Sequence, residues 1–492
     1  MRIAPLSTKP RSGLGPRFYL LIAGVLLCTV ASPALSQQSL RYDYSFLQSE
    51  FGDARARAER IVALAIRYGQ QVFSDEILFH DHGSTRRPDY RIEILGNETS
   101  AFPIMQLTLQ RTSDGSQTDT FNLVGEWNDR LAPVLAQVSL YLIHEMEGLL
   151  SADTGDAPLY AGRFVQGDLG DSALRAQSVQ SLAATGDGQV VLGAQVAGLV
   201  VDRALRYQGT VGAYRSGRAI SSPHFYMVSA NRTGSIVGTS ADRSEFYRYV
   251  PGSEEPEVLR SRLTPLARPL MTDDGTVFGL DLYQSQAERF DGRLSEPGDV
   301  FGGPSGYVMT AAPGPEASLW VYDQTATRIR RYAPDGSLLD ELFAFLPRDV
   351  HYGVRHMAAF DTGDFVLLTT NGLYGFTRDG RVRWQVNTIP GTQGTTSLTA
   401  LAVDSETGLI FVMDGQSKIL HRFWDQDYAT ARFGDSAHLA DIDAAAATWS
   451  GADMSDPEDL AAIAGFSEQS GALNPAAWAC EAALYLYPGY SE

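Results

Sequence analysis

Short apolar runs, each preceded by a turn that contains Gly, Asp or Pro, recur through the middle of the chain. The runs are either alternating or continuously apolar, a pattern that is typical of strands and not of helices. We therefore predict strands in equivalent positions of a repeat. Six segments carry the pattern: GDGQVVLG from Gly186, RTGSIVG from Arg232, DDGTVFGLD from Asp273, PEASLWVYD from Pro315, DTGDFVLLT from Asp361 and SETGLIFVMD from Ser405.

A second element follows each run: an aromatic residue just before a turn, in five of six cases with Arg in front of it. Successive aromatics are 41 to 47 residues apart. A period of about 40–45 residues with several strands is typical of propeller blades. We expect each aromatic to pack between blades and each Arg to face the rim or a loop carboxylate. The aromatics are Tyr207, Tyr249, Phe290, Tyr332, Phe376 and Phe423.

These elements predict a mainly β fold, with a six-bladed β-propeller over residues 160–435. One four-stranded blade cannot bury both of its faces, whereas blades arranged in a ring bury each against its neighbours. In the stretch TRIRRYAPDG, Arg328 and Arg330 are additional to the one Arg that the shared pattern contains. They alternate with Thr327 and Ile329, so we expect them to face outward.

Residues 37–150 show a different pattern, which predicts a small α+β domain. A helical face with Ile61, Leu64, Ala65, Tyr68 and Val72 precedes three alternating strands, around residues 90–94, 105–109 and 121–123. A second helix follows, with one apolar stripe. We expect helix, antiparallel sheet and helix in that order. The stripe consists of Leu131, Val134, Leu135, Val138 and Leu142.

The remaining segments are a linker over residues 151–159 and a helical segment over residues 436–492. In the latter, Asp456 and Asn474 each precede a Pro, as expected for the N-caps of two short helices. These would form a helical hairpin that packs on the propeller.

The first 36 residues have the pattern of a secretory signal peptide. They contain four basic residues, no acidic ones, and an apolar run too short to span a membrane comfortably. A retained N-terminal anchor is the competing interpretation. After cleavage we expect no transmembrane span and a periplasmic or secreted protein.

Removal of this segment leaves 35 basic against 58 acidic residues, a formal charge of −23. Such an acidic protein is a poor match for nucleic acid or an anionic lipid surface. Only Cys480 remains, so the fold uses no intramolecular disulfide.

The Asp that ends three of the apolar runs is a candidate cation ligand: Asp281, Asp323 and Asp414. A ring of acids near one mouth of a propeller could hold a divalent cation, because hard cations bind several convergent oxygens. Alternatively, each carboxylate accepts hydrogen bonds from turn N–H groups of its own blade. We favour this alternative, because a recurring residue need not converge with its equivalents, and we predict no cofactor and no catalytic residue.

Other candidate chemistry is weaker. His80 and His82 lie in the sequence FHDHG, but two imidazoles without a further His or Cys nearby are too few for a closed zinc site. Cys480 lies in an Ala- and Leu-rich helical pattern, where a buried apolar role fits better than nucleophilic catalysis.

Residues 317–339 (ASLWVYDQTATRIRRYAPDGSLL) and 401–423 (LAVDSETGLIFVMDGQSKILHRF) resemble NHL-type repeats. The order of parts resembles the TolB family: signal peptide, small α/β domain and six-bladed propeller. Within the small domain, PDYRIEILGN through RLAPVLAQVSLYLI is similar to the strand, strand, strand, helix unit of that family. These resemblances imply partner binding in the cell envelope.

We therefore expect an exported, non-enzymatic β-propeller protein that binds an envelope or extracellular protein or a surface ligand. The alternative is a metal-dependent propeller hydrolase or lactonase with a cation in the central mouth. Convergence of Asp281, Asp323 and Asp414 on one pocket would favour the alternative.

Overall fold

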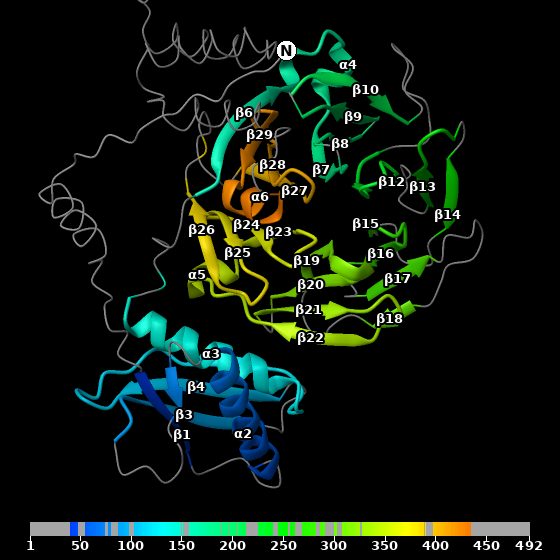
Figure 1. Cartoon of the computed structure of the whole chain (residues 1–492). Helices are drawn as coiled ribbons and strands as arrows, with labels where there is room; N and C mark the ends of the chain where they lie inside the picture. The colour runs from blue at the N-terminus through cyan, green and yellow to red at the C-terminus, as the bar shows by residue number, and fades with distance from the viewer. Residues whose placement is uncertain are drawn as a thin grey trace, which may run out of the picture.

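The computed structural model describes most of residues 40–433, with gaps that include 48–54, 80–86, 151–156, 213–224, 261–267, 291–299, 303–307 and 391–396. The predicted signal peptide, the C-terminal helical segment, Cys480, His80, His82 and most of the linker lie outside the described residues. Two parts follow one another: an N-terminal unit, and a larger ring of sheets (Figure 1). Among the described residues, no helix is long and apolar enough to cross a membrane.

The N-terminal unit is built on one five-stranded sheet in the order β2-β1-β3-β4-β5. The three predicted strands are confirmed as β3 (Tyr90–Asn97), β4 (Ile104–Arg111) and β5 (Phe121–Val124). The sequence analysis missed β1 (Leu40–Phe46) and β2 (Ile77–Phe79), which pair parallel to one another, with β1 also parallel to β3. The sheet is thus mixed, not antiparallel, because a helical crossover joins β1 to β2.

Two helices pack on this sheet. In α2 (Arg55–Val72), Ile61 and Ala65 are buried as predicted, whereas Val72 is exposed at the helix end. In α3 (Leu131–Met146), twelve residues are buried, far more than one stripe. The excess arises because α3 lies between its own sheet and the ring, where Tyr141 contacts Phe343 with ring centroids 5.2 Å apart.

Six four-stranded antiparallel sheets make up the ring in the described part of the chain. We number them in chain order. Sheet 1 contains β7 (Val179–Ala184), β8 (Val190–Ala194), β9 (Gly198–Val201) and β10 (Tyr207–Val211). Sheet 2 contains β11 (Val228–Ala230), β12 (Ile236–Thr239), β13 (Glu245–Tyr249) and β14 (Glu257–Arg260). Sheet 3 contains β15 (Arg268–Met271), β16 (Val277–Asp281), β17 (Gln286–Phe290) and β18 (Val300–Gly302).

The second half of the ring repeats this plan. Sheet 4 contains β19 (Val308–Pro313), β20 (Leu319–Asp323), β21 (Arg328–Tyr332) and β22 (Leu338–Leu342). Sheet 5 contains β23 (Val354–Ala359), β24 (Phe365–Thr369), β25 (Gly372–Phe376) and β26 (Val382–Val386). Sheet 6 contains β27 (Leu398–Asp404), β28 (Leu409–Asp414), β29 (Ile419–Trp424) and, from the start of the ring, β6 (Leu159–Val165).

The first strand of each sheet lies innermost, around a common centre (Figure 1). Each of these strands contacts the first strand of the next sheet, and β27 contacts β7, so the circuit is continuous. The six apolar runs identified in the sequence are the second strands of the six sheets. Short helices lie between or after sheets: α4 (Ser172–Ala176), α5 (Arg348–His351) and α6 (Gln426–Phe433).

Five of the six predicted aromatics lie on third strands, but the sixth does not. Phe290 packs against Phe246 of the preceding sheet, with ring centroids 5.4 Å apart, as expected of a residue between sheets. Tyr207 instead begins the fourth strand of sheet 1 and is exposed. The third strand there, β9, ends at Val201 without an aromatic, so the sequence pattern matched the wrong strand.

The expectation that Arg328 and Arg330 face outward was wrong. Both are buried, and both pair with Glu341 at 2.7 Å. Arg330 also pairs with Asp323 at 2.7 Å, and Arg328 donates to the backbone carbonyl of Val124 in the N-terminal unit. Arg330 pairs in register with Val321, which packs against sheet 3, so this face of β21 lies between two sheets and not on an open rim.

Candidate functional site

The turns between the first and second strands of all six sheets meet at one end of the ring. They line a cavity of about 80 Å³, which we call the mouth. Each sheet contributes at least one residue: Gly186, Arg232, Asp273, Pro315, Asp361 and Ser405. Glycine allows these tight turns: Gly275 and Gly363 have φ of +85° and +88°, a conformation that other residues rarely adopt.

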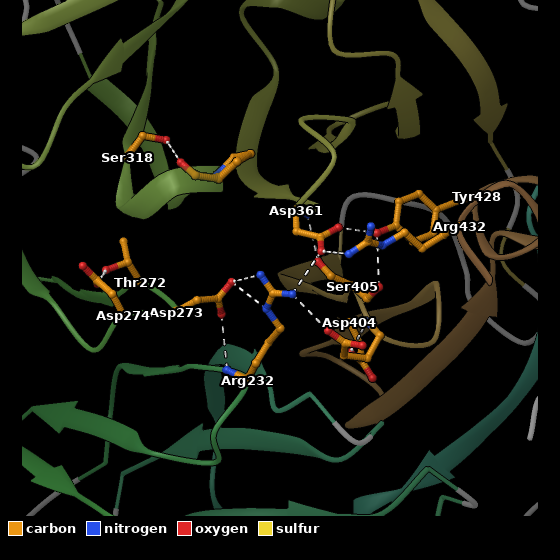
Figure 2. Close-up of polar contacts among 12 residues, drawn as sticks. Arg232, Thr272, Asp273, Asp274, Ser318, Asp361, Asp404, Ser405, Tyr428 and Arg432 are labelled. Carbon is orange, nitrogen blue, oxygen red and sulfur yellow. Dashed lines mark hydrogen bonds and ion pairs between the residues drawn. The ribbon is translucent and has the colours of Figure 1, made fainter.

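Arg232 crosses the mouth and links three other sheets (Figure 2). Its guanidinium lies 2.6 Å from Asp273 of sheet 3, and its Nη1 lies 3.0 Å from both Asp361 of sheet 5 and Glu406 of sheet 6. Asp273 and Glu406 keep 45% and 39% of their side-chain surface exposed. The pairs with Asp273 and Glu406 are therefore accessible from solvent and each contributes little to stability by itself, whereas Asp361 is only 9% exposed.

Asp361 connects the mouth to α6, the helix that follows the last sheet. It accepts a hydrogen bond from the Tyr428 hydroxyl at 2.8 Å and pairs with Arg432 at 2.7 Å (Figure 2). Tyr428 also stacks on Phe360, with ring centroids 4.1 Å apart. These contacts hold α6 against the turn of sheet 5, and burial, followed by hydrogen bonding to Asp361, raises the pKa of Tyr428.

Asp404 lies at the end of β27 and lines the same cavity. Its carboxylate accepts hydrogen bonds from the Glu406 backbone at 3.0 Å and from the Thr407 hydroxyl at 2.8 Å. Burial raises the pKa of Asp404 to about 7, with the hydrogen bonds opposing the shift. This carboxyl group therefore changes charge near neutral pH.

The three predicted cation ligands lie elsewhere. Asp281, Asp323 and Asp414 end the second strands of sheets 3, 4 and 6, away from the turns that form the mouth, and all three are buried. Asp414 accepts hydrogen bonds from the backbone of Gln416 at 2.9 Å and Ser417 at 3.2 Å, within its own turn. Asp323 pairs with Arg330 of its own sheet. The described residues contain no cluster of three or more His, Cys, Asp or Glu that could hold a metal ion.

The charged residues of the mouth occupy equivalent turns in the sequence, but the sequence analysis did not predict that they form a site. Arg232, Asp273, Asp361 and Glu406 all lie in the turns that precede the predicted second strands. The turns were used only to delimit strands. Because equivalent turns of a propeller meet near its axis, charged residues at these positions could have been predicted to converge.

The comparisons with known proteins identify no family for this chain. No protein-family model and no curated protein matches the chain. Similar solved structures include a catalytically inactive virginiamycin B lyase from Staphylococcus aureus with quinupristin, at 10% identity and a TM-score of 0.37, covering 68% of this chain and 99% of that one. Another is a selenomethionine-substituted virginiamycin B lyase from Staphylococcus aureus, at 10% identity and a TM-score of 0.37, covering 67% and 93%. A streptogramin B lyase, at 9% identity and a TM-score of 0.36, covers 68% and 97%.

The four-stranded sheets around a common centre define this chain as a β-propeller protein. The similarity to the lyases is too low to transfer their activity. The chain is thus characterised by its propeller, its N-terminal unit and its charged mouth.

Proposed function

We propose that this chain is an exported, non-enzymatic propeller protein that binds another protein of the cell envelope at the mouth. In this proposal the six sheets are six blades of one ring, with NHL-like repeats, and the N-terminal unit corresponds to the small domain of TolB-like proteins. The signal-peptide pattern of residues 1–36 supports a periplasmic or secreted location.

The dimensions of the mouth are the observation that carries the proposal. Ligand sites for drug-sized molecules are typically about 300–1,000 Å³, several times larger than a cavity of about 80 Å³. A cavity of this size fits one protruding side chain of a protein partner better than a lactone with its flanking groups. A flat protein surface around it could at the same time contact the exposed turns.

The charge of the mouth indicates a cationic group on the partner. The carboxylates of Asp273, Asp361 and Glu406 outnumber the guanidiniums of Arg232 and Arg432, and Asp404 adds a negative charge when it is ionised. A Lys or Arg side chain from the partner would compensate the excess negative charge. It would also be attracted by the acidic surface as the two proteins approach.

The experiment places a photo-crosslinking residue at Thr362, an exposed position in the mouth turn of sheet 5, in cells that express the full chain. The control carries it at Leu339, which is exposed on β22, the outermost strand of sheet 4. We expect one envelope protein to crosslink at Thr362 and not at Leu339. The crosslinked protein is then purified for binding measurements.

Glu406→Lys is expected to weaken binding of that protein at least tenfold, because it places a cation where the proposal places the partner's cation. Glu59→Lys, the same change on the exposed face of α2, is the control and should leave binding unchanged. Equal crosslinking from Thr362 and Leu339 would contradict the proposal. Metal-dependent turnover of a lactone by the purified protein would support the hydrolase instead.

A further inference from the structure

Arg268 is buried in the centre of the ring, at the opposite end of the first strands from the mouth. It is the first residue of β15, whereas the mouth turn follows the last residue of that strand. Only 9% of its surface is exposed, and it lines a second cavity of about 90 Å³ that is formed by the first strands of all six sheets. Its charge is thus held inside the propeller.

Within the part of the chain that the structure describes, the Arg268 guanidinium has no ion-pair or hydrogen-bond partner, and its Nε is buried without one. The other buried arginines with known contacts differ in this respect. Arg328 and Arg330 pair with Glu341, and Arg422 donates to the carbonyl of Ala161. Burial alone lowers the pKa of Arg268 to about 10, so it remains a cation at neutral pH.

The strand register explains why no acid of sheet 3 reaches Arg268. Arg268 pairs with Leu280, and Leu280 pairs with Ala287, so these side chains share the face that packs on sheet 4. Glu288, the nearest acid along β17, pairs with Gly279 and therefore lies on the opposite face.

The surroundings of Arg268 are cationic or uncharged. After burial, the charges of Arg268 and Arg355 are the main causes that lower the pKa of His356, to about 3. The connecting segments 261–267, 303–307 and 390–396, which lie outside the described residues, contain no Asp or Glu in their sequences, whereas 240–244 and 291–299, also outside them, do. A buried charge without a counter-charge is unfavourable, so an anion bound next to Arg268 would stabilise the protein.

We propose that the cavity at Arg268 binds a small organic carboxylate. A guanidinium binds a carboxylate through two parallel hydrogen bonds, which a single Arg can provide. Most of the other side chains that line the cavity are apolar, among them Leu270, Ala311, Ala312 and Met357. These side chains suit a short alkyl group and offer few of the additional donors that a phosphate or sulfate requires. The cavity shares five lining residues with the mouth, but Arg268 does not line the mouth, and the carboxylate site does not depend on the partner proposed there.

The test measures the thermal unfolding midpoint of the full mature protein with acetate, propionate and butyrate, against chloride, phosphate and sulfate at constant ionic strength. We expect a saturable increase with the carboxylates, largest for the chain that best fills the cavity. Isothermal titration calorimetry with the same anions gives the affinities. No increase with any carboxylate, or a larger one with phosphate or sulfate, would overturn the proposal.

Arg268→Met should abolish the carboxylate effect and also raise the midpoint of the ligand-free protein, because it removes a buried charge and keeps an apolar side chain of similar length. Arg260→Met removes the same charge from an exposed position, since 74% of the Arg260 side chain is accessible. It should change neither the carboxylate effect nor the unfolding midpoint of the ligand-free protein. Equal carboxylate stabilisation in Arg268→Met and the wild type would refute the site.

Arg268→Lys provides a second test that does not depend on how well the Met variant folds. Lysine keeps the charge but cannot form the two parallel hydrogen bonds of a guanidinium. We expect it to weaken carboxylate binding at least tenfold. Unchanged affinity in this variant would exclude the bidentate contact on which the proposal rests.

Discussion

Glu341→Gln is expected to destabilise the protein strongly, because Glu341 neutralises two buried arginines. The side chains of Arg328, Arg330 and Glu341 are 1%, 8% and 8% exposed, so water cannot solvate the arginine charge that loses its partner. In the wild type, Glu341 and Asp323 balance Arg328 and Arg330. The variant leaves one buried positive charge uncompensated. Breaking a buried ion pair from one side costs about 3–5 kcal/mol, and we expect a loss in that range.

The measurement is urea unfolding followed by tryptophan fluorescence. Trp320 lies in sheet 4 and Trp127 in the N-terminal unit, both buried, so the signal reports on both sides of the interface. Asp340→Asn is the matched control: it removes the partner of Arg331, whose pair is partly exposed, and should cost about 0–1 kcal/mol.

A double variant separates charge balance from packing. Adding Arg328→Met to Glu341→Gln leaves only the Arg330 and Asp323 pair, which is neutral. We expect the double variant to be more stable than Glu341→Gln alone. If the double variant is less stable, or if Glu341→Gln costs no more than Asp340→Asn, the reasoning from buried charge fails.

Three further predictions concern the mouth and the buried histidine. Asp361→Asn should weaken the contacts with Arg232 and Arg432 and speed amide hydrogen exchange in α6, measured by mass spectrometry, while exchange in β20 stays unchanged. The pKa of Asp404 is raised to about 7 in the folded state, so its contribution to stability is present below about pH 4 and is lost as the pH rises to 7. Asp404→Asn should therefore stabilise the protein more at pH 8 than at pH 5 in urea titrations; the opposite order would contradict the shift. Burial, the main cause, lowers the pKa of His421 to about 3, so its contribution is present above the unfolded pKa of about 6.5 and is lost as the pH falls toward 3. His421→Gln should reduce the slope of unfolding free energy against pH in this window by up to about 1.4 kcal/mol per pH unit, and an unchanged slope would argue against a neutral buried imidazole.

The sequence predicted the strands of the ring well because the signals are local. A turn that contains Gly, Asp or Pro, followed by an apolar run, defines each second strand, from β8 to β28, without information from elsewhere in the chain. The prediction that Tyr207 lies on a third strand failed, because sheet 1 has no aromatic residue at the end of its third strand and a similar motif occurs a few residues later.

The features that were mispredicted depend on contacts between distant parts of the chain. Alternation along β21 gives Arg328 and Arg330 the same pattern as surface residues, but this face of the strand packs toward sheet 3, and Arg328 also contacts the N-terminal unit. The mouth also requires the ring, since Arg232 and Glu406 are 174 residues apart in sequence. The candidate aspartates were correctly located at strand ends, but the turn that converges on the axis is at the other end of each strand.

The strand β6 lies at the start of the ring in sequence but completes its last sheet, so the ring closes only after β29 has formed. It pairs with β29, and Tyr160 and His421, which contact one another across this pairing, are separated by 261 residues. When β6 emerges during synthesis, its partner strand does not yet exist, and its hydrogen-bonding edge stays open until the rest of the ring has followed. Closure is therefore a late, slow step with a large loop entropy. Until it occurs, β6 of one molecule can pair with β29 of another, so folding at high protein concentration would favour strand-exchanged dimers.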